Sequence, residues 1–234
     1  MNHQGDNSSW ANSSAVRIGE DTRATFITRT YVHLFGAVIA FVLIESWLFS
    51  SGIADRMARA MLGTSWLLVL GGFILVSWVA SRAAHTARSL TTQYLALAGF
   101  VVAEAVIFVP LLWIAFIKAP GAVQSAATVT LIAFACLTAV AFLSRKDFSF
   151  LGSILRWGFM IALIAIVSGL LFGFHLGTWF SVAMVAFAGA AILYDTSNVI
   201  HHFPEDRYVA AALELFASVA LMFWYVLRLF IARD

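Results

Sequence analysis

Long apolar segments alternate with short polar ones along the chain after residue 30. Each apolar segment is close to the length of about 20 residues that an α-helix needs to cross a bilayer. The segments are residues 31–50, 62–81, 94–116, 123–143, 154–174, 179–200 and 208–231. This pattern predicts an all-α membrane protein built as a bundle of seven transmembrane helices.

Small residues are concentrated in the last two apolar segments. They are Ser181, Ala183, Ala186, Ala188, Gly189, Ala190 and Ala191, then Ala210, Ala211, Ala212, Ala217, Ser218 and Ala220. Small faces let helix backbones approach closely, and in lipid this contact replaces the missing hydrophobic drive. We therefore expect these two segments to pack as a tight hairpin, with the last helix enclosed by the others.

The first 30 residues are polar and lack an apolar stretch followed by a small-residue cleavage site, so no signal peptide is predicted. We expect residues 1–30 to form a flexible cytoplasmic tail and residues 31–234 to form the transmembrane domain. With the N-terminus inside, most of the 14 Lys and Arg residues fall on the cytoplasmic side. The positive-inside rule favours this orientation, which places the C-terminus outside.

Composition narrows the class of protein further. The chain is 62% hydrophobic and 11% charged, whereas a soluble domain is about half apolar and a quarter charged. Its net charge of +2 is too small to indicate a nucleic-acid partner. The single cysteine, Cys136, excludes an internal disulfide or a thiolate metal cluster, and its apolar surroundings predict a buried thiol. Neither a His-Glu-x-x-His motif nor a serine nucleophile turn is present, so we predict no enzyme activity and no cofactor.

Four carboxyl groups fall inside the predicted helices: Glu45, Glu104, Asp195 and Glu214. An ionisable group in hydrocarbon costs several kcal/mol unless it is paired, protonated or hydrated. Glu45 lies near the outer end of its helix and is expected to reach the membrane interface. Glu104 precedes Pro110 in the same segment, where it can contribute to ion coordination or bond to a carbonyl freed by the proline.

Asp195 and Glu214 lie on either side of the last turn. Asp195 is about 7 Å from the end of its helix and Glu214 is about 9 Å into the next, at the standard helical rise. In an antiparallel hairpin they reach nearly the same depth, where two carboxyl groups can share a proton. Once ionised, they offer oxygen ligands suited to calcium. The alternative is that each acid bonds separately to a neighbouring helix.

Basic and titratable groups surround the predicted pair at the same end of the bundle. His201 and His202 either tune the acids as pH changes or are solvated loop residues. Arg82 and Arg88 follow the second segment, where they either pair with the acids or lie at the surface.

Several stretches of the C-terminal third resemble the transmembrane Bax inhibitor motif family, also called the Bax inhibitor-one family. They are residues 192–196 (Ile-Leu-Tyr-Asp-Thr), 204–208 (Pro-Glu-Asp-Arg-Tyr), 211–216 (Ala-Ala-Leu-Glu-Leu-Phe) and 223–230 (Phe-Trp-Tyr-Val-Leu-Arg-Leu-Phe), with residues 146–151 (Lys-Asp-Phe-Ser-Phe-Leu) before the fifth segment. The resemblance implies a seven-helix fold with the last helix central. It also implies a pH-sensitive calcium leak gated by two aspartates, and eukaryotic relatives tied to suppression of cell death.

Asp195 matches the first of those two aspartates. Ser218 stands where the family carries the second, and Glu214 lies one turn earlier. We expect Glu214 to replace the missing acid, so that Asp195, Glu214 and Ser218 form the gate and the two acids bind the metal ion transiently.

Two functions are therefore expected. The first is a pH-sensitive calcium leak channel, with calcium as the transported ion. The alternative is a non-transporting regulator that binds another membrane protein and modulates a membrane protease or a stress pathway. Either protein would lie in the plasma (inner) membrane of a bacterium, or in an internal membrane such as the endoplasmic reticulum of a eukaryote.

Overall fold

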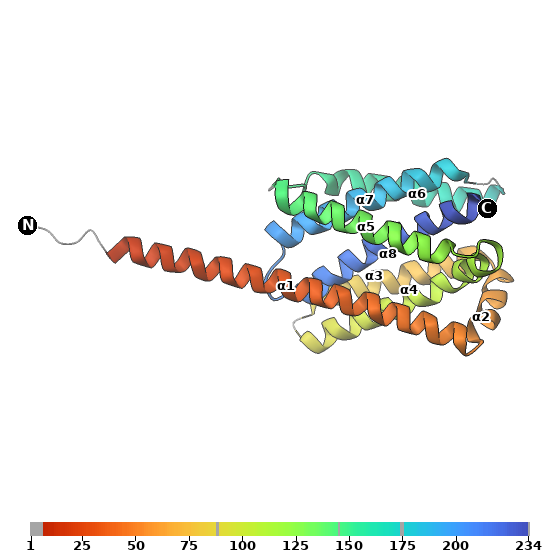
Figure 1. The fold of residues 1–234 in the computed structure, drawn as a ribbon, viewed down its shortest axis with the longest axis horizontal. Coiled ribbons are helices and arrows are strands. Elements are labelled where there is room, and N and C mark those ends of the chain that lie inside the picture. The colour runs from red at the N-terminus through yellow and green to blue at the C-terminus, as the bar shows by residue number, and fades with distance from the viewer. Residues whose placement is uncertain (1–6, 88, 145, 174–175, 234) are drawn as a thin grey trace, which may run out of the picture.

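The computed structural model describes residues 7–87, 89–144, 146–173 and 176–233, with side chains from residue 21 onward. Within these ranges the chain is helical and forms no strand. The helices are α1 (Asn7–Ser50), α2 (Ile53–Leu62), α3 (Trp66–Thr86), α4 (Leu90–Lys118), α5 (Ala122–Ser144), α6 (Leu151–Phe172), α7 (Thr178–His201) and α8 (Tyr208–Arg233). They lie side by side in one bundle (Figure 1).

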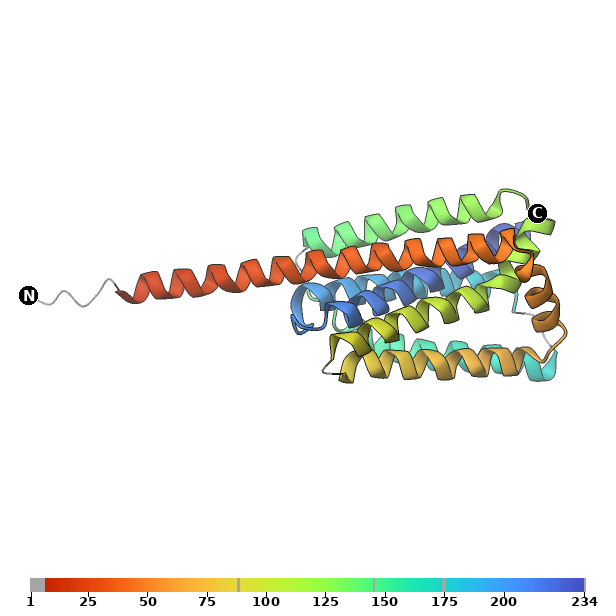
Figure 2. The same ribbon diagram turned by 90° about the horizontal axis from the view of Figure 1, so that it is seen from below.

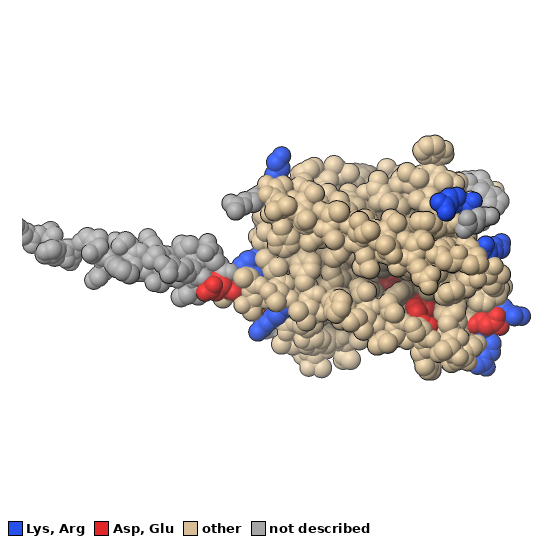
Figure 3. Space-filling model, in the orientation of Figure 1, with Lys and Arg blue, Asp and Glu red and all other residues tan. Residues whose placement is uncertain are grey.

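Seven helical segments are long and apolar enough to cross a bilayer: Asp21–Ser50 of α1, and all of α3, α4, α5, α6, α7 and α8. This confirms the prediction of an all-α membrane protein. The first segment begins ten residues earlier than predicted, and the other boundaries differ by at most five residues. On the visible face, Lys and Arg lie at the two ends of the bundle, Asp and Glu lie at the ends and in one hollow, and the rest of the face is without charged residues (Figure 3). The protein is therefore an integral, multi-pass membrane protein.

The short helix α2 was not anticipated from the sequence. It buries Ala54 and Ala58 against α4 and the end of α1, and Trp113 of α4 donates a hydrogen bond to Asp55 at 3.1 Å. Gly52 makes the sharp turn before α2 possible because its φ of 72° lies in the left-handed region. Since α2 uses residues 53–62, the second membrane helix begins at Trp66 rather than at residue 62.

Helix α8 lies at the centre of the bundle. It contacts α7, α1, α5, α4 and α3 (Figures 1 and 2). Its first turns are almost fully buried because Ala210, Ala211 and Ala212 leave room for neighbouring backbones. The predicted tight hairpin and central last helix are both present.

The outer helices present apolar side chains to the surroundings of the bundle. Helix α6 contacts α7 and α3 alone, and Ala162 is its one buried residue within the described part of the chain. Cys136 of α5 is also exposed, so the expectation of a buried thiol was wrong. An apolar run does not show which side chains face lipid, because lipid and protein interior are equally apolar.

Helix α1 extends beyond the other helices at its N-terminal end (Figures 1 and 2). Residues 7–30 belong to this helix, whereas the sequence suggested a flexible tail through residue 30. Where α1 meets the bundle, Arg23 donates hydrogen bonds to the carbonyl oxygens of Ile200 (2.9 Å) and Phe203 (2.5 Å). The start of the first membrane helix is thereby attached to the turn between α7 and α8. The division into a tail and a domain beginning at residue 31 stays a prediction, as does the cytoplasmic location of the tail.

Candidate functional site

Asp195 lies on α7, two turns before the helix ends, and is 8% exposed. The hydroxyl of Ser218 on α8 donates a short hydrogen bond to Asp195 Oδ2, at 2.5 Å. The small residues of both helices allow this close approach. The structure therefore brings together two of the three residues expected to form a gate.

Glu214 lies one turn before Ser218 on α8, and its carboxylate meets a histidine from α3. His85 Nε2 is 2.7 Å from Glu214 Oε1, and the two side chains are 36% and 29% exposed. Histidine changes charge between about pH 5 and 8 when its environment is ordinary. This contact joins the hairpin of α7 and α8 to the end of α3.

The two acids are near enough to interact electrostatically. Among the described residues, however, no hydrogen bond joins one carboxyl group to the other, because each has its own partner. Asp195 is bound by Ser218, and Glu214 by His85. The arrangement is thus a four-residue cluster: two acids, a hydroxyl and an imidazole from three different helices. We call Asp195, Ser218, Glu214 and His85 the α7–α8 cluster.

Arg207, in the turn before α8, closes the end of the bundle beside this cluster. Its guanidinium donates to the carbonyl oxygen of Ala87, two residues after His85, at 2.5 Å, and lies 3.4 Å from Asp206. It therefore links the end of α3 to the turn between α7 and α8. An arginine held next to the cluster places a permanent positive charge near His85.

A second acidic centre lies at the same end, in the loop before α6. Asp147 accepts a hydrogen bond from the backbone N–H of Ser149 at 2.8 Å, and its Oδ2 lies 2.9 Å from His202 Nε2. These two contacts lower the pKa of the Asp147 carboxyl to about 2. Ser197 of α7 also donates to Asp147, at 3.4 Å. The loop is thereby fastened to the end of α7.

The other residues singled out from the sequence lie apart from the cluster. Arg82 is exposed and its guanidinium lies over the ring of Trp78, and Arg88 falls outside the described residues. His201 is exposed, and His202 binds Asp147 rather than either membrane acid. Glu104 is buried within α4. Glu45 is also buried, so the expectation that it would reach the interface was wrong.

Asp195 and Glu214 were expected to bind a metal ion. Among the described residues, no group of three or more His, Cys, Asp or Glu side chains is placed to hold one. Calcium takes six to eight oxygen ligands, so two carboxylates and one hydroxyl supply only part of a coordination shell.

Sequence reasoning missed His85 and Asp147. His85 follows the second predicted segment by four residues, on the same side as the two acids, and that position was the available signal. Asp147 lies in one of the stretches that resemble the Bax inhibitor family, but its partner His202 is 55 residues away along the chain. Contacts between distant segments depend on how the helices pack, and a single sequence does not indicate this packing.

The family model described as "Inhibitor of apoptosis-promoting Bax1" matches residues 23–234 of this chain. The chain belongs to the Bax inhibitor family. The match covers all seven membrane segments apart from two residues at the start of the first. The α7–α8 cluster therefore lies within the matched region.

Three relatives illustrate the range of this family. The modulator of FtsH protease YccA of Escherichia coli K12 is 34% identical over 110 residues, which are 45% of this chain and 49% of the relative. An uncharacterized protein of Pseudomonas aeruginosa is 35% identical over 111 residues, 46% of this chain and 49% of its own. The Golgi anti-apoptotic protein of vaccinia virus strain Lister is 28% identical over 180 residues, 75% of this chain and 73% of its own. The match thus spans about half the length of each bacterial relative and about three quarters of the viral Bax inhibitor family protein.

Proposed function

We propose that this Bax inhibitor family protein is a pH-sensitive cation leak whose gate is the α7–α8 cluster, with calcium as the ion carried. The observation that carries the proposal is the bond between Ser218 and the buried Asp195, next to the Glu214–His85 pair. Buried acids in a membrane protein mark ion or proton paths. In this cluster the buried Asp195 lies on α7 and the half-buried Glu214 lies on the central helix, α8.

The chemistry of the cluster suits a gate that responds to protons. When Asp195 is bonded to Ser218, it holds α7 against α8 and offers little to a cation. When both acids are ionised they repel each other and attract a hard cation. His85 adds a titratable imidazole that contacts Glu214 directly.

Calcium flux into liposomes tests this function. The protein is reconstituted with a calcium-sensitive dye inside the vesicles, and flux is measured from pH 5 to pH 8. We expect flux above that of empty liposomes, dependent on pH, with the pH dependence lost in Asp195→Asn. Asp206→Asn, an exposed carboxyl at the same end, is the matched control and should behave as the unmodified protein. Absence of flux, or unchanged pH dependence in Asp195→Asn, would contradict the gate.

The second candidate is a regulator of a membrane protease, and the observation that favours it is the Escherichia coli relative named as a modulator of FtsH protease. In this case the cluster stabilises the hairpin of α7 and α8 and carries no ion. A membrane location fits both candidates, and YccA of another Escherichia coli strain is named an inner membrane protein.

Co-reconstitution with Escherichia coli FtsH separates the two candidates. A regulator changes the rate at which FtsH degrades a membrane substrate, and it does so in liposomes that show no calcium flux. A channel changes calcium flux and leaves the degradation rate as it is. If the protein is a regulator, Asp195→Asn should lose thermal stability. If it is a channel, Asp195→Asn should lose pH-dependent flux.

A further inference from the structure

A cavity separate from the α7–α8 cluster lies between α1, α4, α5 and α8, in the half of the bundle away from the α7–α8 turn. Its volume is about 360 Å³ and its walls are mainly aromatic and aliphatic. Volumes of about 300 to 1,000 Å³ are usual for sites that bind small molecules. This half of the bundle takes no part in the proposed gate.

The cavity opens sideways, towards lipid. Val42 of α1, Phe116 of α4 and Leu131 of α5 line it, and each is more than half exposed. Figure 3 shows acidic side chains within a hollow of the same apolar face. A molecule dissolved in the bilayer can therefore enter without crossing water.

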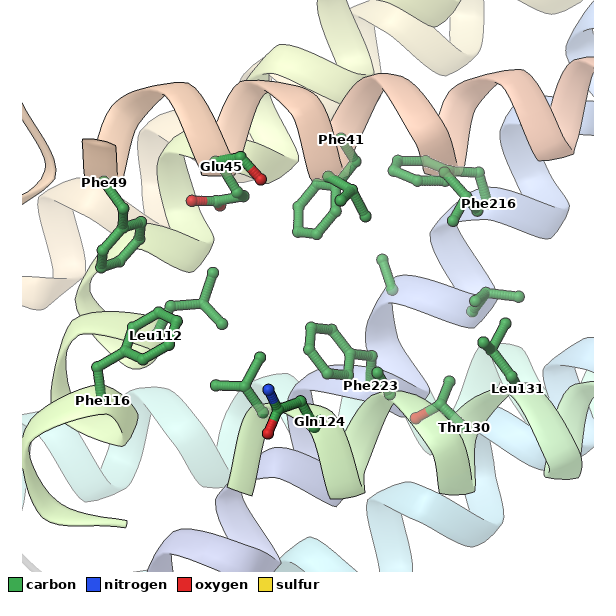
Figure 4. A pocket seen from close by; sticks show the side chains of 17 residues that line it. Phe41, Glu45, Phe49, Leu112, Phe116, Gln124, Thr130, Leu131, Phe216 and Phe223 are labelled. Atoms are coloured by element: carbon green, nitrogen blue, oxygen red, sulfur yellow. The ribbon is translucent and has the colours of Figure 1, made fainter. Parts of the chain in front are cut away.

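The unusual feature of the cavity is Glu45. This side chain is 7% exposed, it lines the cavity, and neither of its carboxyl oxygens has a hydrogen-bond partner. Figure 4 shows its carboxyl on the cavity side of α1, between Phe41 and Phe49. No Lys, Arg or His is among the described residues that line the cavity. A buried carboxyl without a partner is costly, so a cationic ligand would supply what the protein lacks.

The rest of the wall suits the same kind of ligand. Phe41, Phe49, Phe116 and Phe223 line the cavity, and aromatic faces attract organic cations while covering a hydrocarbon chain. Thr130, on the opposite wall, also has a buried hydroxyl without a partner. We propose that this cavity binds an amphiphilic amine, with the ammonium on Glu45 and the hydrocarbon chain between α1 and α5. The proposal does not depend on the proposed function.

Photolabelling in nanodiscs of phosphatidylcholine tests the proposal. The probes are dodecylamine, dodecanol and dodecanoic acid, each carrying the same diazirine near the end of its chain. After irradiation, peptides are mapped by mass spectrometry. We expect the amine to label the cavity walls on α1 and α5 strongly, and an excess of unlabelled dodecylamine to suppress that labelling. The alcohol and the acid should label these walls at least about tenfold less, the scale of one charge-assisted contact.

Two variants identify the site. Glu45→Gln should lower labelling by the amine at least about tenfold and leave labelling by the alcohol unchanged. Ala127→Leu, which fills the cavity from α5, should lower labelling by the amine even if Glu45→Gln does not fold. Ala135→Leu, on the exposed side of the same helix, is the matched control and should change nothing. Equal labelling by the three probes, or labelling by the amine that neither Glu45→Gln nor Ala127→Leu reduces, overturns the proposal.

Discussion

Asp195 and Glu214 differ in their surroundings because helix packing gives each acid a different partner. Both acids were expected at the same end of the last hairpin, and both are there. Their partners, Ser218 and His85, give them different surroundings: one acid is buried against a hydroxyl and the other is partly exposed against an imidazole. Sequence spacing shows the depth of an acid in the membrane but not the side chain that a third helix brings to it.

The bond from Ser218 to Asp195 leads to a stability prediction. Ser218→Ala removes the donor and leaves a buried carboxyl oxygen unpaired, so we expect the free energy of unfolding to fall by about 1–3 kcal/mol. Thermal unfolding in detergent measures this change. Ser77→Ala is the matched control because the Ser77 hydroxyl is buried without a partner, and its removal should change stability by less than about 0.5 kcal/mol. Equal losses in the two variants would show that the Asp195 bond contributes nothing.

Asp147 leads to a prediction about pH. Its folded pKa of about 2 is below its ordinary value of 3.8, so its contribution to stability is present above about pH 4 and is lost as pH falls towards 2. Asp147→Asn should therefore unfold at a lower temperature than the unmodified protein at pH 7, and the difference should shrink at pH 3. Asp21→Asn, at the same end of the bundle, is the control, and it should lose stability on acidification as the unmodified protein does. If Asp147→Asn and the unmodified protein differ in unfolding temperature by the same amount at pH 7 and pH 3, the lowered pKa of Asp147 is contradicted.

At the scale of the helices, sequence reasoning located every long one and missed α2. A membrane helix is recognisable because about 20 consecutive residues must be apolar. Helix α2 has 10 residues with charged positions among them, and it is held by Ala54 and Ala58 packing below α4. That contact is tertiary, so nothing local distinguishes α2 from an ordinary loop.

The contact between α6 and α7 depends on glycine. A Cβ atom at Gly158 would lie 2.8 Å from the Phe187 ring, whereas one at Gly72 of α3 would meet nothing within 4 Å. Gly158→Ala should therefore force the ring or the helix aside and cost about 1–3 kcal/mol of stability. Gly72→Ala, the matched control, should be neutral or stabilising by up to about 1 kcal/mol because alanine favours the helix. Thermal unfolding of the two variants compares them, and equal stability would show that α6 adjusts freely.

For the whole molecule, the charge pattern makes a prediction about orientation that the fold does not test. Because Lys and Arg favour the cytoplasmic side, the turn between α7 and α8 should face the cytoplasm and the turn after α4 the opposite side. In a Cys136→Ala background, Asp206→Cys should react with an impermeant maleimide only after the cells are opened. Lys118→Cys should react in intact cells. The reverse result would show that the bundle has the opposite orientation in the membrane.

Helices α6 and α8 mark the two extremes of how many neighbours a membrane helix has. Helix α8 contacts five others, whereas α6 contacts two and buries only Ala162 among its described residues. A library of random variants selected for stable expression should therefore accept most apolar exchanges along α6, and reject almost any change of size at Ala210, Ala211 or Ala212. Over evolutionary time, the outer helix is free to drift with the composition of the host membrane, while the inner one keeps its shape.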